Sequence, residues 1–112
     1  MRHEPAGASF ALEEAGAGRL RAQGALVFAT ARRACAAGVQ RLRAAGTTPV
    51  TIDCAGVTAA DSAGLAVLLE WFGAARAAGG ALRLETLPGG LRALARISEV
   101  SELLEPGGAP AP

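Results

Sequence analysis

The sequence lacks several residues and segments on which common functions depend. It has one histidine, His3, and all 11 of its basic residues are arginines. Without lysine or a second histidine, a serine nucleophile would have no base to activate it. No apolar run reaches about 18 residues, and the N-terminal stretch lacks the apolar core of a signal peptide. These absences argue against an enzyme and predict a cytoplasmic protein with no transmembrane helix.

Cysteine and net charge are also scarce. Cys35 and Cys54 are the two cysteines, and they do not form a CxxC motif. We expect both thiols to be buried as small hydrophobic groups without a disulfide. The formal net charge of +1 gives no attraction to nucleic acid. No phosphate-binding loop or metal-ligand motif is present, so we predict neither a cofactor nor a metal.

The 112 residues suffice for one domain. Alternating and helical patterns predict the order β-β-α-β-α-β-α. We expect strands at 9–16, 19–28, 50–54 and 81–87, and helices at 31–45, 62–78 and from 91 onward, with a short last element at 99–105. This order is typical of an α/β fold, with a mixed sheet of four to five strands flanked by three or more helices. Residues 1–8 form a disordered N-terminus, 9–104 the domain, and 105–112 a flexible Pro/Gly-rich tail.

Two helix starts carry polar residues. Thr30 is expected to cap the helix at 31–45, and the pair Asp61-Ser62 precedes the helix at 62–78. This pair can cap free N–H groups, contact a partner, or do both. It follows a strand, where parallel sheets place functional loops.

The helix at 62–78 is apolar almost all the way round. One stripe is predicted to face the sheet and consists of Leu65, Leu68, Leu69 and Phe72. Ala63 and Val67 then point roughly the opposite way, and Trp71 lies on the flank. Either a neighbouring helix covers this flank, or Trp71 anchors a partner on an exposed apolar patch.

The stretch from Thr51 through "DSAGL" (61–65) to the helix "LRALARIS" resembles a STAS domain over residues 9–104. STAS domains occur in sulfate transporters and in anti-sigma-factor antagonists. The segments "GALVFAT" and "DSAGLAVLLEW" are most similar to the STAS subunits of Mla-type phospholipid ABC transporters. The resemblance implies a non-enzymatic subunit that binds the transporter's ATPase, supports outer-membrane lipid asymmetry, and reaches the inner membrane only through that complex.

The resemblance also implies a site. Ser62 would contact the ATPase, together with the surrounding residues Asp61, Ala63, Gly64, Val67, Trp71 and Thr30. The alternative is an anti-sigma-factor antagonist, in which a partner kinase phosphorylates the serine at this position. Antagonists usually carry "GELD" at the end of the second strand, whereas this chain has "GALV", with Ala25 and Val27 in place of the acidic residues.

Overall fold

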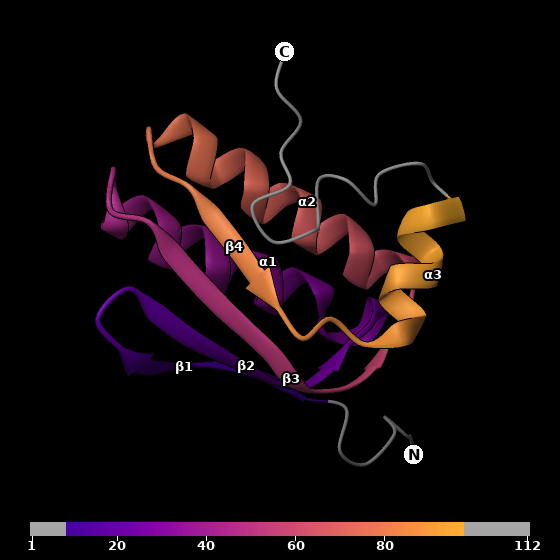
Figure 1. The fold of residues 1–112 in the computed structure, drawn as a ribbon. Helices are drawn as coiled ribbons and strands as arrows, with labels where there is room; N and C mark the ends of the chain where they lie inside the picture. Colours follow the sequence, from indigo (N-terminus) through magenta and orange to yellow (C-terminus); the bar gives the residue numbers. More distant parts are fainter. Residues whose placement is uncertain (1–8, 98–112) are drawn as a thin grey trace.

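A computed structural model describes residues 9–97 as four strands and three helices. The chain order is β-β-α-β-α-β-α, as predicted (Figure 1). The strands are β1 (Phe10–Gly16), β2 (Arg19–Leu26), β3 (Val50–Ala60) and β4 (Leu82–Glu85), and the helices are α1 (Phe28–Ala45), α2 (Ser62–Ala77) and α3 (Gly89–Ile97). The predicted α/β class with a mixed sheet is confirmed.

The sheet has the strand order β1-β2-β3-β4. A tight hairpin pairs β1 with β2 in antiparallel fashion, whereas β2 with β3 and β3 with β4 are parallel. The register aligns Leu20, Ile52 and Leu84 across three strands, and all three are buried. Because side chains alternate between faces along a strand, this row forms the inner face of the sheet.

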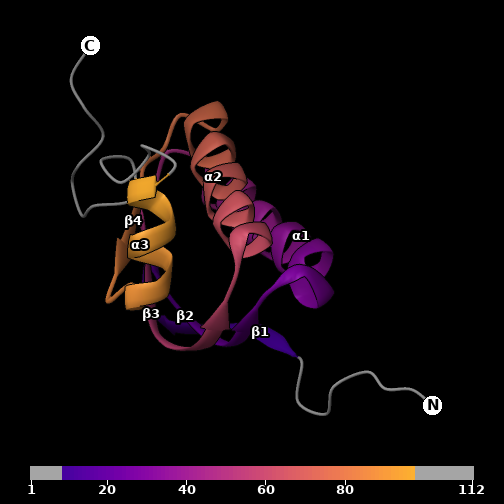
Figure 2. The same ribbon diagram turned by 90° about the vertical axis from the view of Figure 1, so that its right-hand side faces the viewer.

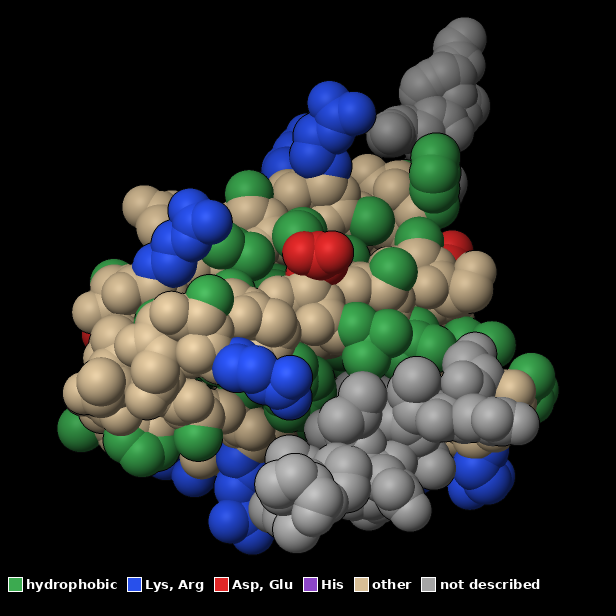
Figure 3. Space-filling model, turned by 90° about the horizontal axis from the view of Figure 1, so that it is seen from above, with side chains coloured by type: hydrophobic (Ala, Val, Ile, Leu, Met, Phe, Trp, Pro, Cys, Tyr) green, Lys and Arg blue, Asp and Glu red, His purple; other side chains and the backbone are tan. Residues whose placement is uncertain are grey.

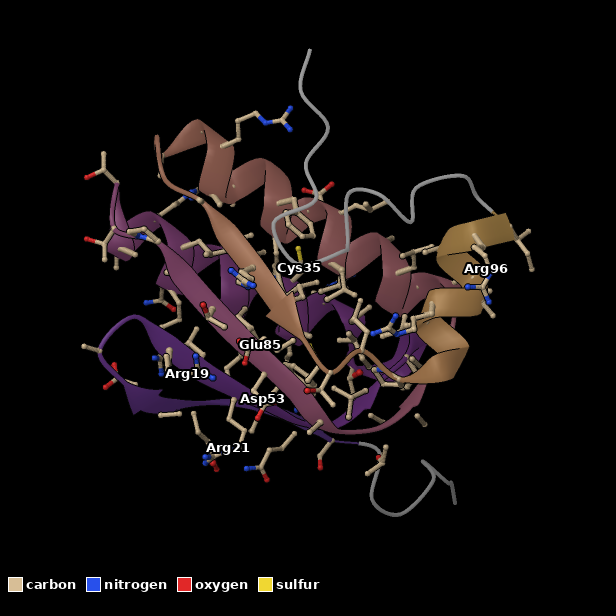
Figure 4. All side chains as sticks on the ribbon, viewed as in Figure 1. Arg19, Arg21, Cys35, Asp53, Glu85 and Arg96 are labelled. Atoms are coloured by element: carbon tan, nitrogen blue, oxygen red, sulfur yellow. The ribbon has the colours of Figure 1, made fainter. Side chains whose placement is uncertain are left out.

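The opposite face of the sheet is polar. Arg21, Asp53 and Glu85 are aligned across β2, β3 and β4, and Figure 4 shows them on the same side of the sheet. Arg19 reaches across β3 to Glu85, with 2.8 Å between Nη2 and Oε1. Such partly exposed ion pairs contribute little stability. The alternation of buried and charged residues thus directs one face of the sheet toward the core and the other toward solvent.

Helices α1 and α2 lie side by side over the inner face, and α3 lies at the β4 side (Figure 2). The core fills the space between this helix layer and the sheet. Leu26, Leu42 and Leu68 are almost completely buried there. From α3, Leu91 and Ala95 join the same core. This two-layer packing leaves the outer surfaces of α1 and α2 as the broad helical face of the molecule.

Two predicted boundaries were wrong by three residues or more. Helix α1 begins at Phe28 rather than at Ala31, so Thr30 lies inside its first turn. Strand β3 continues to Ala60 rather than ending at Cys54. The extension runs along β2 through two register irregularities, and a Cβ on Gly56 would approach the Ala22 carbonyl oxygen to 2.9 Å. The absence of a side chain at Gly56 therefore allows the two strands to stay together beyond the expected end.

Some sequence predictions concern residues outside 9–97. These are the two terminal segments at 1–8 and 105–112, His3, and the last short element at 99–105. Within residues 9–97, no helix combines the length and apolar character needed to span a membrane.

Candidate functional site

The carboxylate of Asp61 organises the starts of two helices. Its Oδ1 accepts hydrogen bonds from the N–H groups of Ala63 (2.9 Å) and Gly64 (3.1 Å), which caps α2. Its Oδ2 accepts a hydrogen bond from the N–H of Phe28 at 3.1 Å, at the first residue of α1. Free N–H groups at helix starts need such acceptors. Asp61 is therefore the cap, and it ties α1 and α2 to a common starting point.

The glycine of "DSAGL" brings α2 directly against β2. A Cβ on Gly64 would collide with the backbone carbonyl of Leu26, the last residue of β2. The N–H of Asp61 also donates to the Leu26 carbonyl oxygen, at 3.4 Å. The predicted site residues Asp61, Ser62, Ala63 and Gly64 thus sit together at the end of β2, with Gly64 buried in a packing role.

Ser62 is the first residue of α2, and its side chain is exposed. No residue of the range 9–97 forms a hydrogen bond with its hydroxyl group, so nothing there activates it as a nucleophile. The hydroxyl is available for recognition by another molecule or for modification. This exposure is compatible with the predicted contact between Ser62 and a partner.

Phe28 is an exposed aromatic residue that the sequence analysis missed. It lies at the same end of the helix layer as Ser62, and 83% of its surface is exposed. Phe28 was assigned to the strand at 19–28, which hid the fact that it begins a helix. Phe28 stands two residues before Thr30, and this local sequence carries no signal that distinguishes an exposed helix start from the end of an apolar strand.

Thr30 does not cap α1 in the way predicted. It occupies the third position of the helix, and Val27 is the N-cap. The Thr30 hydroxyl donates to the Ala25 carbonyl oxygen at 2.7 Å and accepts from the Val27 N–H at 3.1 Å. Its side chain is 6% exposed. Thr30 therefore fastens the turn between β2 and α1 from the inside, and its hydroxyl is already engaged.

Trp71 is fully buried. Its Nε1–H donates to the Ala34 carbonyl oxygen of α1 at 3.2 Å. The indole fits against Gly38, where a Cβ would collide with it, and its ring centroid is 6.1 Å from that of Phe10. The open alternative is thereby resolved: α1 covers Trp71, which packs between the helices and β1 and cannot anchor a partner.

On the solvent side of the same helix pair lies a shallow groove of about 590 Å³, here called the outer groove. From α2 it is lined by Ala63, Ala66, Val67 and Glu70, and from α1 by Phe28, Ala31, Arg32, Cys35, Ala36 and Val39. Figure 3 shows hydrophobic side chains scattered among backbone and other side chains on this side of the molecule, with an acidic side chain near the centre and arginines around it. The outer groove extends the surface that begins at Ser62.

Val67 is buried although it was expected to point away from the sheet. It forms part of the floor of the outer groove, on the solvent side of the helix pair. Among the stripe predicted to face the sheet, Leu65 and Leu68 are buried, whereas Leu69 and Phe72 are half-buried. Helix α1 covers the flank of α2 that carries Trp71, which is one of the two alternatives that the sequence left open.

The two cysteines differ in environment. Cys54 is buried in the core, and burial together with the nearby Asp53 charge raises the pKa of its thiol to about 12. Cys35 is only half-buried, contrary to expectation, and lines the outer groove. Burial, and next the charge of Glu70, raise the pKa of the Cys35 thiol. Both thiols are free and neutral, and only Cys35 is reachable from outside.

A small mixed sheet with two helices on one face, and an Asp-Ser pair at a helix start, is the arrangement of a STAS domain. In a comparison with solved structures, the fold resembles that of the anti-sigma-factor antagonist SpoIIAA in its unphosphorylated form. The TM-score is 0.60 at 17% sequence identity, over 79% of this chain and 82% of that one. A search of curated proteins finds no match. The family model described as "Mlab, STAS domain" matches residues 10–105, and the chain belongs to this STAS family.

Proposed function

We propose that this chain is the non-enzymatic STAS subunit that binds the ATPase of a phospholipid ABC transporter, in a complex that maintains outer-membrane lipid asymmetry. The exposed Ser62 at the start of α2 carries the proposal, because it presents an unbonded hydroxyl beside the exposed ring of Phe28. The description of the matching family, which names Mlab, supports the same assignment.

The neighbourhood of Ser62 suits recognition of a protein partner. Asp61 holds the starts of α1 and α2 in place, so Ser62 and Phe28 are presented on a rigid support. Exposed aromatic residues next to apolar surface are frequent anchors at interfaces. The opposite, charged face of the sheet offers no comparable apolar surface.

The test is to co-purify the full chain with the ATPase subunit of the phospholipid transporter encoded in the same genome. We expect a stable complex, which Ser62→Glu weakens at least tenfold because a charge is buried without a partner. Ser62→Ala serves as the matched control and weakens it only about threefold, since one neutral hydrogen bond is lost. Absence of any complex between the wild-type chain and that ATPase would refute the proposed function.

A second candidate function is that of an anti-sigma-factor antagonist switched by phosphorylation of Ser62. The observation in its favour is the same free hydroxyl at a helix start, where the helix dipole tolerates a phosphate. Incubation with ATP and the kinase-fold anti-sigma factors of the same cell would then add one phosphate to Ser62, read by mass spectrometry. Ala25 and Val27, at positions where antagonists carry acidic residues, place this candidate second.

A further inference from the structure

We propose that the outer groove receives one amphipathic helix of the ATPase subunit, with acidic side chains on its flank toward α1 and basic side chains on its flank toward α2. This inference rests on the proposed function and adds to it the form and the chemistry of the contacting segment.

The shape of the outer groove suits a helix. Helices α1 and α2 start at the same carboxylate, and Trp71 of α2 contacts Ala34 and Gly38 of α1 further along, so the two helices run in the same direction. A groove between two such helices accepts a third one in the manner of ridges into grooves. Ala31, Ala63 and Ala66 line it with small side chains that permit close approach of another backbone.

The surface of the outer groove is apolar along its length. Val67 and Cys35 contribute to its lining, and at the end near Ser62 stands Phe28, whose ring has almost no cover. An apolar stripe on a partner helix would bury these groups together. Phe28 then acts as the anchor, and the exposed Ser62 lies at the end of the same contact.

The charges at the two rims of the outer groove are opposite. Arg32 lies on the α1 rim and Glu70 on the α2 rim, and neither forms an ion pair within residues 9–97. A helix with acidic residues facing Arg32 and basic residues facing Glu70 complements both rims. Reversing that helix would exchange its flanks and oppose like charges, so the two rims also select its direction.

The first test fills the outer groove without touching the core. Ala66 is exposed on α2 within the groove, and Ala77 is exposed on the same helix outside it. We expect Ala66→Arg to weaken the complex with the ATPase at least tenfold and Ala77→Arg to change it less than twofold, as measured by titration. Both variants retain the thermal stability of the wild type, since arginine is a good helix former.

The second test reverses the rim charges. Glu70→Arg and Arg32→Glu each weaken the complex about tenfold, and Glu70→Gln has a smaller effect, because like charges oppose only in the reversals. The bound ATPase also slows maleimide labelling of Cys35 at least fivefold. Photo-crosslinkers placed at positions 31 and 36 capture ATPase residues spaced three or four apart, as on one helix face.

The outcomes separate this inference from the proposed function. If the wild-type chain binds the ATPase and Ala66→Arg binds equally well, the groove is not the docking site, while the function stands. Crosslinks to an extended segment would contradict a helical occupant. A wild-type dimer that Ala66→Arg dissociates would place a second copy in the groove and overturn the inference. If no ATPase binds the wild type, both ideas fail.

Discussion

Helices α1 and α2 form two apolar spaces between them, one on the sheet side and one on the solvent side, and the two are used differently. On the sheet side, Ala34 and Gly38 leave room that the indole of Trp71 fills completely. On the solvent side, the outer groove stays open, and the small side chains of Ala31, Ala63 and Ala66 are part of its lining. The helix pair thus has one space closed by its own tryptophan and one left open.

The difference shows how one helix pair both stabilises the fold and offers a surface for binding. A buried space filled by a large rigid side chain stabilises the fold through close packing. An open space lined by small side chains adds little to stability and is available for contact. Variants on the two sides should therefore separate sharply, with large effects on unfolding on the sheet side and effects on binding on the solvent side.

The largest expected effect is that of Trp71→Ala. Removing the indole leaves a cavity between α1, α2 and β1, and we expect the free energy of unfolding to fall by about 3–5 kcal/mol. The control Phe28→Ala, on the exposed ring, should change it by less than about 0.5 kcal/mol. Urea unfolding followed by circular dichroism measures both. Similar losses in the two variants would contradict the contrast.

A smaller effect is expected from Gly38→Ala. The new methyl group would collide with the indole of Trp71, and such overpacking costs about 1–3 kcal/mol. Gly73→Ala is the matched control, because a Cβ there meets nothing within 4 Å and Gly73 is exposed on α2. We expect it to stabilise the fold by roughly 0.5–1 kcal/mol. The two melting temperatures should move in opposite directions.

The smallest of these effects concerns Asp61, the cap shared by the starts of α1 and α2. Asp61→Ala removes the acceptor of three N–H groups, and we expect a loss of about 1–2 kcal/mol in the free energy of unfolding. Asp61→Asn keeps one carbonyl oxygen and should lose less. If Asp61→Ala is as stable as the wild type, water replaces the carboxylate. Faster hydrogen exchange of the Phe28 and Gly64 N–H groups would then reveal that replacement.

Much of the fold followed from local patterns. The alternation in 19–28 and the β-branched run at 50–54 predicted the strands β2 and β3, and the apolar period in 62–78 predicted α2. Boundaries failed where local signals conflict. The apolar run ending at Phe28 reads as a strand, and Thr30 resembles a cap, although its hydroxyl bonds back to Ala25 and Val27. Residues 55–60 form strand despite low β propensity, because β2 lies beside them.

The site was predictable only in part. The position of Ser62 at a helix start could be read from the Asp-Ser pair followed by the apolar helical period at 62–78. The direction of Trp71 could not, since a helical pattern in α2 does not say where α1 crosses, and Gly38 creates its socket 33 positions earlier in the chain. The outer groove likewise arises from residues of two helices that are adjacent only after folding.

The shared carboxylate at the start of both helices has a mechanical consequence. Because a single side chain clamps two segments 33 positions apart, the ends carrying Phe28 and Ser62 cannot tilt independently. Whatever docks there meets a preformed platform and loses little free energy in ordering it. Conversely, a force that pulled one of these helix starts outward would act on the other through the hydrogen bonds of Asp61.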